Sequence, residues 1–281
     1  MPLDDAWVGL VDDAAIFPPG DAPPPTAVTA HRKHREAAYA DVVGPFVVDD
    51  VRLPALIDVL RAAAPLAVTV VVKGGVGAVA SAVDVARSSP ALDLRSIEVA
   101  VRQDDDIAAQ LHRLNTAVPT FVEVPILPEG PTPSWLAGLD EIATAGHRLK
   151  LRTGGLTPEA FPDARALAAS IAGALEREVT FKCTAGLHHA LRHREQATGL
   201  ERHGFLNVLV ATAAAGDGAD AGDLAALLDT RDAATLLGTV ATREWEAARR
   251  SFTSFGCCDV LDPIRDLVAL DLLDHFLLEH A

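Results

Sequence analysis

The sequence predicts an α/β fold, a single (β/α)8 barrel over residues 1–281 with a helical insertion at about residues 187–250. Short β-rich runs recur eight times, and most are followed by an Ala- and Leu-rich stretch with helical spacing. The length of 281 residues suits one large domain, and a hydrophobic content of 49% is ample for its core. No G-x-G-x-x-G sequence follows the first β-rich run, which disfavours the alternative, an open doubly wound sheet.

Each βα unit is predicted from an apolar, β-branched run and the helical spacing that follows it. In the first unit, WVGLVDD (7–13) leads through the proline-rich loop FPPGDAPPP to a helix at 26–40. The seventh strand is predicted at 179–186, and the eighth strand at 251–259 precedes a closing helix at 262–279. The strands and helices predicted in between are 45–49 and 53–63, 66–73 and 75–88, 94–101 and 104–115, 119–126 and 133–145, and 147–155 and 163–176.

The rhythm breaks after the seventh strand, where residues 187–250 are too many for one helix and its loops. LHHALRHREQATGLERHG predicts a loop or short helix, FLNVLVATAAAG a helix, and AGDLAALLDT and ATLLGTVATREWEAARRS two more. The insertion should start at the carboxyl ends of the strands, where barrel active sites lie. We therefore expect His188, His189 and Arg192 to border the pocket and the helices after Gly204 to anchor this segment to the barrel.

Charge and composition disfavour several classes of function. A formal charge of −15 does not suit a nucleic-acid partner, and no uncharged apolar run reaches the length of a membrane span. The amino-terminal segment has early acids and no basic region, unlike a signal peptide. Cys183, Cys257 and Cys258 do not form a disulfide framework, so we expect a cytoplasmic protein. We expect no cofactor, and the composition leaves a homo-oligomer open.

Polar residues of one parity alternate with apolar residues along the predicted strands. In RLKLR (148–152), Leu149 and Leu151 should face the helices, which turns Arg148, Lys150 and Arg152 toward the barrel axis. The same alternation predicts that further polar side chains face the axis or end a strand, namely Lys182, Thr184, Glu98, Glu123, Asp12, Asp13 and Lys73.

Such a cluster has two interpretations. Buried charges need partners, so Lys150–Glu123 and Lys182–Glu98 could be ion pairs that only stabilise the barrel. Alternatively, the cations hold an anionic substrate, shielded from the acidic exterior of the protein. Two neighbouring lysines should also lower each other's pKa, which would make one of them a competent nucleophile toward carbonyls.

The lysine motifs resemble those of deoxyribose-phosphate aldolase, a class I aldolase family. KLRTG (150–154) and KCTAG (182–186) match that family's K-x-x-T-G and K-x-[ST]-x-G motifs on the sixth and seventh strands. The resemblance implies a Schiff base on Lys150 and a perturbing role for Lys182. It also implies an acid on the fourth strand, where this chain has Glu98 in place of the family's aspartate.

The family's phosphate-binding turn on the last strand corresponds to FGCCD (255–259) here, with two cysteines in place of hydroxyl residues. The whole chain also resembles a bacterial and plant group of (β/α)8-barrel proteins, which implies the same fold. The motifs that carry this second resemblance are FPP (17–19), KLRTGG (150–155), FKCTAGLHH (181–189) and HGFLN (203–207).

We therefore expect a Schiff-base-forming lyase that acts on a small anionic carbonyl compound, phosphorylated or not. Lys150 would attack the carbonyl, Lys182 would perturb it, and Glu98 or Glu123 would move protons together with His188. The residues expected to bind the substrate are Arg152, Thr153, Gly154, Gly155, Thr184, His189, Asp13, Gly256 and Cys257.

Two other functions stay open at this point. A metal-dependent hydrolase or isomerase would use Asp12, Asp13, His188 and His189 as ligands. A non-catalytic protein that binds an anion or a sugar phosphate would use the same scaffold without turnover. In either case, the helix that begins near residue 262 should lower the pKa of the thiol of Cys257.

Overall fold

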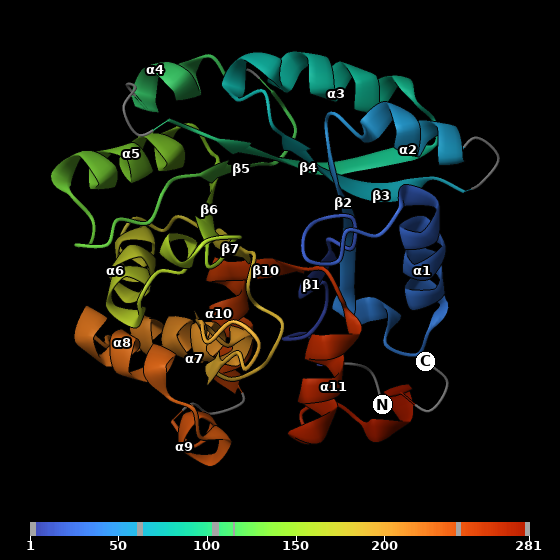
Figure 1. Ribbon diagram of the computed structural model, residues 1–281. Coiled ribbons are helices and arrows are strands. Elements are labelled where there is room, and N and C mark those ends of the chain that lie inside the picture. Colours follow the sequence, from blue (N-terminus) through green and yellow to red (C-terminus); the bar gives the residue numbers. More distant parts are fainter. Residues whose placement is uncertain (1–3, 61–63, 103–106, 115, 240–242, 279–281) are drawn as a thin grey trace.

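Eight parallel strands close into a barrel that is ringed by helices (Figure 1). The computed structural model describes residues 4–60, 64–102, 107–114, 116–239 and 243–278. Around the barrel the strands follow the order β1-β10-β7-β6-β5-β4-β3-β2, so neighbours in the sequence are neighbours in the sheet. The predicted (β/α)8 barrel is confirmed.

The barrel strands overlap all eight predicted runs. Most strands are shorter than predicted, whereas those predicted at 45–49 and 94–101 begin two residues earlier. Their bounds are β1 Val11–Asp13, β2 Val43–Asp49, β3 Leu66–Val72, β4 Leu92–Ala100, β5 Thr120–Glu123, β6 Arg148–Arg152, β7 Phe181–Thr184 and β10 Phe252–Cys257.

The helices cover the outer face of the barrel. Thr132 caps α5 by accepting the Trp135 amide, and Asp163 caps α6 by accepting the Ala166 amide. The α-helices of the first six units are α1 Pro24–Glu36, α2 Leu53–Leu60, α3 Val79–Ser88, α4 Ile107–His112, α5 Pro133–Thr144 and α6 Ala164–Leu175. The 3-10 turns are η1 Ala40–Val42, η2 Val76–Ala78, η3 Pro158–Ala160 and η4 His275–Leu278, and α11 spans Leu261–Ala269.

Four predicted helices include residues outside the described part of the chain. The residues concerned are 61–63, 104–106 and 115, 240–242, and 279. The closing helix, predicted as one element over 262–279, is divided in the structure, because α11 ends at Ala269 and the chain continues into η4. Within the described residues, no helix is long and apolar enough to span a membrane.

Four helices and a small antiparallel pair lie between β7 and β10. The pair joins β8 (His193–Arg194) to β9 (Glu201–Arg202), where a loop or short helix was predicted. Two residues per strand are too few for a periodic signal, so only the fold reveals this pair. The helices that follow are α7 Phe205–Gly216, α8 Ala221–Asp229, α9 Ala233–Leu237 and α10 Arg243–Ser251.

Helix α7 is the anchor of this segment. It packs against α8, α10 and β10, and the ring of Phe205 stacks on Phe255 with 5.0 Å between centroids. Because neighbours surround its first part, the residues from Phe205 to Ala213 are all buried. Asn207 accepts the Arg192 amide at 2.8 Å and donates to the carbonyls of Leu227 and Thr230 at 2.7 Å. The helix that follows Gly204 therefore contacts the barrel directly through β10.

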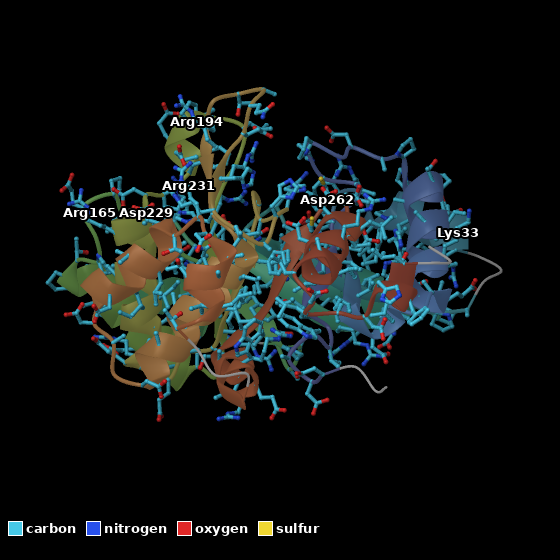
Figure 2. All side chains as sticks on the ribbon, turned by 90° about the horizontal axis from the view of Figure 1, so that it is seen from below. Lys33, Arg165, Arg194, Asp229, Arg231 and Asp262 are labelled. Carbon is cyan, nitrogen blue, oxygen red and sulfur yellow. The ribbon has the colours of Figure 1, made fainter. Side chains whose placement is uncertain are left out.

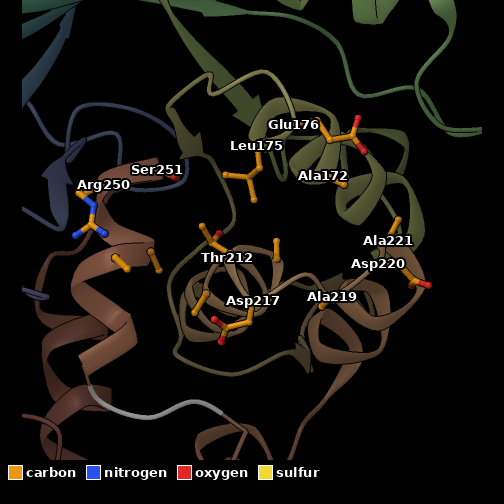
Figure 3. A pocket seen from close by; sticks show the side chains of 15 residues that line it. Ala172, Leu175, Glu176, Thr212, Asp217, Ala219, Asp220, Ala221, Arg250 and Ser251 are labelled. Carbon is orange, nitrogen blue, oxygen red and sulfur yellow. The ribbon is translucent and has the colours of Figure 1, made fainter.

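A pocket of about 610 Å³ lies among α6, α7, α8 and α10, toward the carboxyl ends of α6 and α10 (Figure 3). Its lining is rich in alanine and includes Leu175, Thr212 and Arg250. Helices α6 and α10 each lead directly into the start of a barrel strand, so this pocket is at the end of the barrel opposite the predicted active site.

Candidate active site

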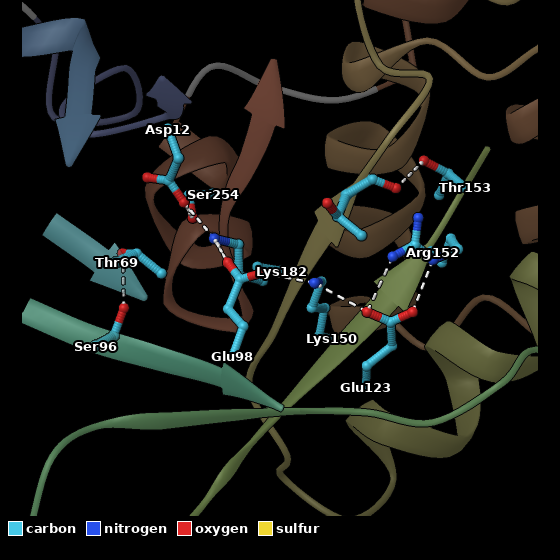
Figure 4. A network of polar contacts seen from close by, with 11 residues as sticks. Asp12, Thr69, Ser96, Glu98, Glu123, Lys150, Arg152, Thr153, Lys182 and Ser254 are labelled. Carbon is cyan, nitrogen blue, oxygen red and sulfur yellow. Dashed lines mark hydrogen bonds and ion pairs between the residues drawn. The ribbon is translucent and has the colours of Figure 1, made fainter. Parts of the chain in front are cut away.

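A continuous chain of ion pairs crosses the barrel interior from β1 to β6 (Figure 4). Carboxylates and cations alternate along it, so that each charge contacts at least one of opposite sign. Three carboxylates and three cations take part, which makes the chain neutral when all six are ionised. In order, its members are Asp12, Lys182, Glu98, Lys150, Glu123 and Arg152.

Lys182 lies at the closed end of this chain. Its ammonium group donates to Asp12 and, at 2.6 Å, to Oε1 of Glu98. Ser254 donates its hydroxyl to the same carboxylate oxygen of Asp12 at 2.9 Å. The ring of Phe121 lies 5.2 Å from the ammonium nitrogen, within range of a cation–π contact. The side chain of Lys182 is 1% exposed, so these groups replace its hydration shell.

Lys150 lies in the middle of the chain and connects it to the mouth. Its ammonium nitrogen is 2.6 Å from Oε2 of Glu98 and 2.9 Å from Oε2 of Glu123. Arg152 donates two hydrogen bonds to Glu123, with Nε 2.7 Å from Oε1 and Nη2 3.3 Å from Oε2. The exposed fraction of the side chain rises from 3% at Lys150 to 16% at Glu123 and 45% at Arg152.

The register of the barrel strands places the charged residues of the ion-pair chain on neighbouring positions. Lys150 pairs with Lys182 across β6 and β7, and Glu123 pairs with Lys150 across β5 and β6. Leu149, Leu151, Phe181 and Cys183, which have the opposite parity, are fully buried in the layer under the helices. The predicted pairs Lys150–Glu123 and Lys182–Glu98 are both confirmed.

The predicted mutual lowering of the lysine pKa values is wrong for Lys182. Burial opposes its charge, but the carboxylates of Asp12 and Glu98 outweigh burial and raise the pKa of Lys182 above its ordinary value. Burial also opposes the charge on Glu98, yet Lys150 and Lys182 together lower its pKa to about 2. Strand alternation placed both lysines inside, but it could not predict that Glu98 lies between them and contacts both.

Asp12 was not among the residues expected to take part in lysine chemistry. Burial raises the pKa of its carboxyl group, and Lys182 only partly offsets this effect. Asp13, which was expected to bind substrate, points to the outer layer, where it accepts from Nδ1 of His31 at 2.9 Å and from the Ala15 amide. Because strand residues alternate, only one of the two aspartates can face the axis, and the flanking Val11 carried that signal.

Phe121 and Ser254 are two further members of the site that the sequence alone did not single out. A lone phenylalanine or serine in a strand has many structural uses, and only the closed barrel brings both within reach of Lys182. Phe121 also lies 5.4 Å from the guanidinium of Arg148. Arg148 is exposed at the amino end of β6, so the three cations of that strand face the axis at three different depths.

The Thr153-Gly154-Gly155 turn, expected to hold an anionic group, packs against the end of β7. Thr153 is 1% exposed, and its hydroxyl donates to the carbonyl oxygen of Ala185 at 2.6 Å. A Cβ on Gly154 would lie 3.1 Å from the Cα of Gly186, so this close approach needs glycine. The hydroxyl proton of Thr153 is therefore used to join the two lysine-bearing strands.

Thr184 and Gly256 line the barrel in the row of residues above the lysines. The Cα partners run from Arg152 to Thr184 and from Thr184 to Gly256, across β6, β7 and β10. A Cβ on Gly256 would lie 3.6 Å from the hydroxyl of Thr184, an ordinary contact. Glycine leaves this position of the row, next to Thr184, without a side chain.

His188 forms a separate group near the mouth with Cys257, the last residue of β10, and Cys258, the residue after it. Nδ1 of His188 is 3.4 Å from the Asp262 carboxylate and 3.6 Å from Sγ of Cys257, while Nε2 is 3.7 Å from Sγ of Cys258. The predicted lowering of the Cys257 pKa is wrong. Burial raises the pKa of this thiol well above its ordinary value, and the nearby acidic residues, Asp259 and Asp262, add to the effect.

A pocket of about 660 Å³ opens beside this group. His188 and His189 line it together with Arg194, Asp259 and other polar residues from the loops after β1, β7 and β10, and its lining includes no residue of the ion-pair chain. Arg194 lies on the segment that projects from the body of the molecule (Figure 2). His189 contacts Asp266 of α11 at 3.2 Å.

The prediction that Arg192 borders this pocket is wrong. Its side chain is 8% exposed and turns toward the helices, where Nε lies 2.8 Å from Asp229 and Nη1 lies 3.1 Å from Nδ1 of His203. His203 is buried as well, and burial lowers its pKa to about 4. Arg192 is therefore part of the anchor of the segment.

The four candidate ligands of the metal-dependent alternative are dispersed. Asp12 contacts Lys182, Asp13 contacts His31, and the two histidines contact separate aspartates of α11. Across the residues that the structure describes, no group of three or more His, Cys, Asp or Glu side chains is arranged to hold a metal ion.

Comparison with known proteins adds no family to this description. No family model matches the chain, and a search of curated proteins finds no relative. The fold and the charged interior therefore stand as the basis for any assignment of function.

Proposed function

We propose that the protein is a Schiff-base-forming lyase of the class I aldolase type that acts on a small anionic carbonyl compound. The observation that carries this proposal is the position of Lys150 in the ion-pair chain. It is a buried lysine next to a second cation, and Oε2 of Glu123, which can take its proton, lies 2.9 Å away. The barrel fold is compatible with such an enzyme. The likeness of the lysine motifs to those of deoxyribose-phosphate aldolase supports the same chemistry.

Lys150 is the better nucleophile of the two lysines. Lys182 is held as a cation by two buried carboxylates at the sealed end of the chain. Lys150 shares Glu123 with the half-exposed Arg152, so its surroundings lead to solvent. Lys182 lies one strand away from Lys150, as its Cα partner across β6 and β7.

The reaction would begin with transfer of a proton from Nζ of Lys150 to Oε2 of Glu123. The neutral amine would attack the carbonyl carbon, and one proton would move from the attacking nitrogen to the carbonyl oxygen to give a neutral carbinolamine. Protonated Glu123 would return its proton to the departing hydroxyl, which leaves as water as the imine forms. Glu98 would stay ionised throughout, since its pKa is about 2, and would hold the two lysines in place.

Borohydride trapping tests the proposal. The protein would be incubated with a panel of short aldehydes and keto compounds, each with and without an acidic group, and then reduced. We expect a reduced adduct on Lys150 and none on Lys33, an exposed lysine of α1 that serves as the internal control. The site of the adduct would be read by peptide mass spectrometry.

Lys150→Met and Lys182→Met provide the matched variants. Loss of the adduct in Lys150→Met, in a protein that still unfolds cooperatively, would support the assignment. An adduct on Lys182, or no adduct from any compound of the panel with the folded wild-type protein, would contradict it.

The half-exposed side chain of Arg152 favours a second candidate function, a barrel that binds a small anion without chemistry. Every ionised group in the chain already has a partner of opposite sign, as a stabilising interior requires. This candidate predicts thermal stabilisation by anions in the absence of any lysine adduct.

A further inference from the structure

Glu123 is shared by two cations, and the outer one is reachable from solvent. Its Oε2 atom lies 2.9 Å from the Lys150 nitrogen and 3.3 Å from Nη2 of Arg152, while Oε1 lies 2.7 Å from Nε of Arg152. Lys150 itself is 3% exposed and lies beneath this pair, whereas the Arg152 side chain is 45% exposed. Access to Lys150 along β6 therefore leads past the Arg152–Glu123 pair.

We infer that the substrate is a short oxo acid whose carboxylate replaces Glu123 on Arg152 and so frees Glu123 to accept the proton of Lys150. This inference rests on the proposed lyase function and deepens it, because it names both the substrate class and the step that activates the lysine. Arg152 becomes the residue that binds the substrate, and Glu123 becomes the base that the substrate releases.

The shape of the existing pair supports a carboxylate as the group that binds. Arg152 holds Glu123 through two nitrogens and two oxygens, the forked geometry that a guanidinium makes with a carboxylate. An incoming carboxylate of the same shape can take over both contacts. Arg152 and Lys150 are two residues apart on one face of a strand, about 6.6 Å along it. A short molecule can therefore place its carboxylate on one and its carbonyl on the other.

The electrostatics of Glu123 explain why its release matters. Burial opposes its charge, but Lys150 and Arg152 outweigh burial and lower the pKa of Glu123. While both cations hold it, Glu123 is a poor base. A substrate carboxylate that neutralises Arg152 removes one of the two, and transfer of a proton from Lys150 to Glu123 becomes more favourable. The lysine is then deprotonated only when an acidic substrate is in place.

The other side of the mouth disfavours a phosphate dianion. Asp259 and Asp262 line the pocket next to α11, and a carboxylate oxygen of Asp259 already accepts the Leu261 amide at 2.9 Å. In many barrels the loops after the last two strands bind phosphate through the start of such a helix. Here the chain's own carboxylate takes that position, so Arg152 is the better anchor for the substrate's charge.

Acetylation of Lys150 by N-acetoxysuccinimide, an uncharged reagent, tests the inference without requiring Schiff-base chemistry. The rate would be followed by peptide mass spectrometry with and without formate, and Lys33 would serve as the reference. In the wild-type protein we expect formate to accelerate acetylation of Lys150 saturably, by about tenfold, because Glu123 loses one of its two cations. The rate at Lys33 should not change.

Three variants locate the effect. Arg152→Leu and Glu123→Gln should each make the acetylation of Lys150 insensitive to formate. Arg148→Leu removes a cation from the same strand, outside the Lys150–Glu123–Arg152 cluster, and should keep the activation.

Equal activation of the Arg152→Leu variant, or no activation of the wild-type protein, would overturn the inference. Stronger activation by phosphate than by formate would overturn the assignment to a carboxylate. If no aldehyde gives an adduct on Lys150 while formate still accelerates its acetylation, the lyase function is wrong and the release of Glu123 by an anion stands.

Discussion

The two ends of the ion-pair chain are built from the same kinds of residue but differ in surroundings. At the β1 end, Lys182 is enclosed by two carboxylates, a serine hydroxyl acts on Asp12, and a phenylalanine ring covers the ammonium group. At the β6 end, Lys150 shares a carboxylate with Arg152, whose side chain is 45% exposed. Lys182 is enclosed on all the sides described above. Lys150 is separated from solvent by the Arg152–Glu123 ion pair, which a ligand could displace.

This difference indicates a division of labour. A lysine that stays protonated can stabilise neighbouring carboxylates and exert an electrostatic effect on a second lysine. It cannot act as a nucleophile itself. A lysine whose partner carboxylate is shared with an accessible arginine can be uncovered by a ligand. Each of the following experiments measures how unequal the two ends are.

Replacement of the two lysines should give the largest contrast. Lys182→Met leaves Asp12 without a cation in the buried interior, so we expect a loss of about 3–5 kcal/mol in the free energy of unfolding. Lys150→Met should cost about 1.5–3 kcal/mol, since Glu98 keeps Lys182 and Glu123 keeps Arg152. Denaturant titration at pH 7 measures both. Equal losses would show that the two ends are equivalent.

Removal of Glu98, the carboxylate that contacts both lysines, should change the free energy of unfolding in a pH-dependent way. Glu98 has a pKa of about 2 in the folded protein and an ordinary value of 4.5. A lowered pKa stabilises the fold above pH 4.5, and this stabilisation is lost as the pH falls toward 2. Glu98→Gln should therefore cost about 3 kcal/mol at pH 7 and progressively less below pH 4.5. Unfolding curves between pH 2 and pH 7 test this, and a loss that is independent of pH would contradict it.

Ser254→Ala probes the closed end more gently. The hydroxyl donates one hydrogen bond to Asp12, which keeps its contact with Lys182 in the variant. We expect a loss of about 1 kcal/mol in the free energy of unfolding. Thermal or denaturant unfolding measures it, and Ser254→Thr, which keeps a hydroxyl, is the matched control. A loss of the same size in the control would point to packing as the cause.

Arg152→Leu at the open end should have the smallest effect on stability. The pair with Glu123 is half-exposed, and such pairs contribute about 0–1 kcal/mol. We therefore expect a change within about 1 kcal/mol in the free energy of unfolding. Added salt should reduce the difference between the wild-type protein and the variant, because it screens the exposed pair. A loss as large as that of Lys182→Met would mean that the open end is structural.

The sequence by itself determined the barrel and the inward direction of its charged residues. Alternating β-rich and helical runs defined eight units, and strand parity turned Glu98, Glu123, Lys150 and Lys182 toward the axis. The helical spacing and the strand alternation are local patterns, so each can be recognised in a short segment of sequence without knowledge of its tertiary contacts. The ion pairs between adjacent strands followed from the same parity.

Only the tertiary structure decided how these charges are combined. It placed Glu98 between the two lysines, paired Asp12 with Lys182 and brought Ser254 and Phe121 to Lys182. It also turned Arg192 into the helical anchor. These contacts join residues far apart in the sequence, and their geometry depends on the stagger of the strands in the closed barrel. The pKa of a buried group follows from such distances, so its direction could be read only after the barrel had closed.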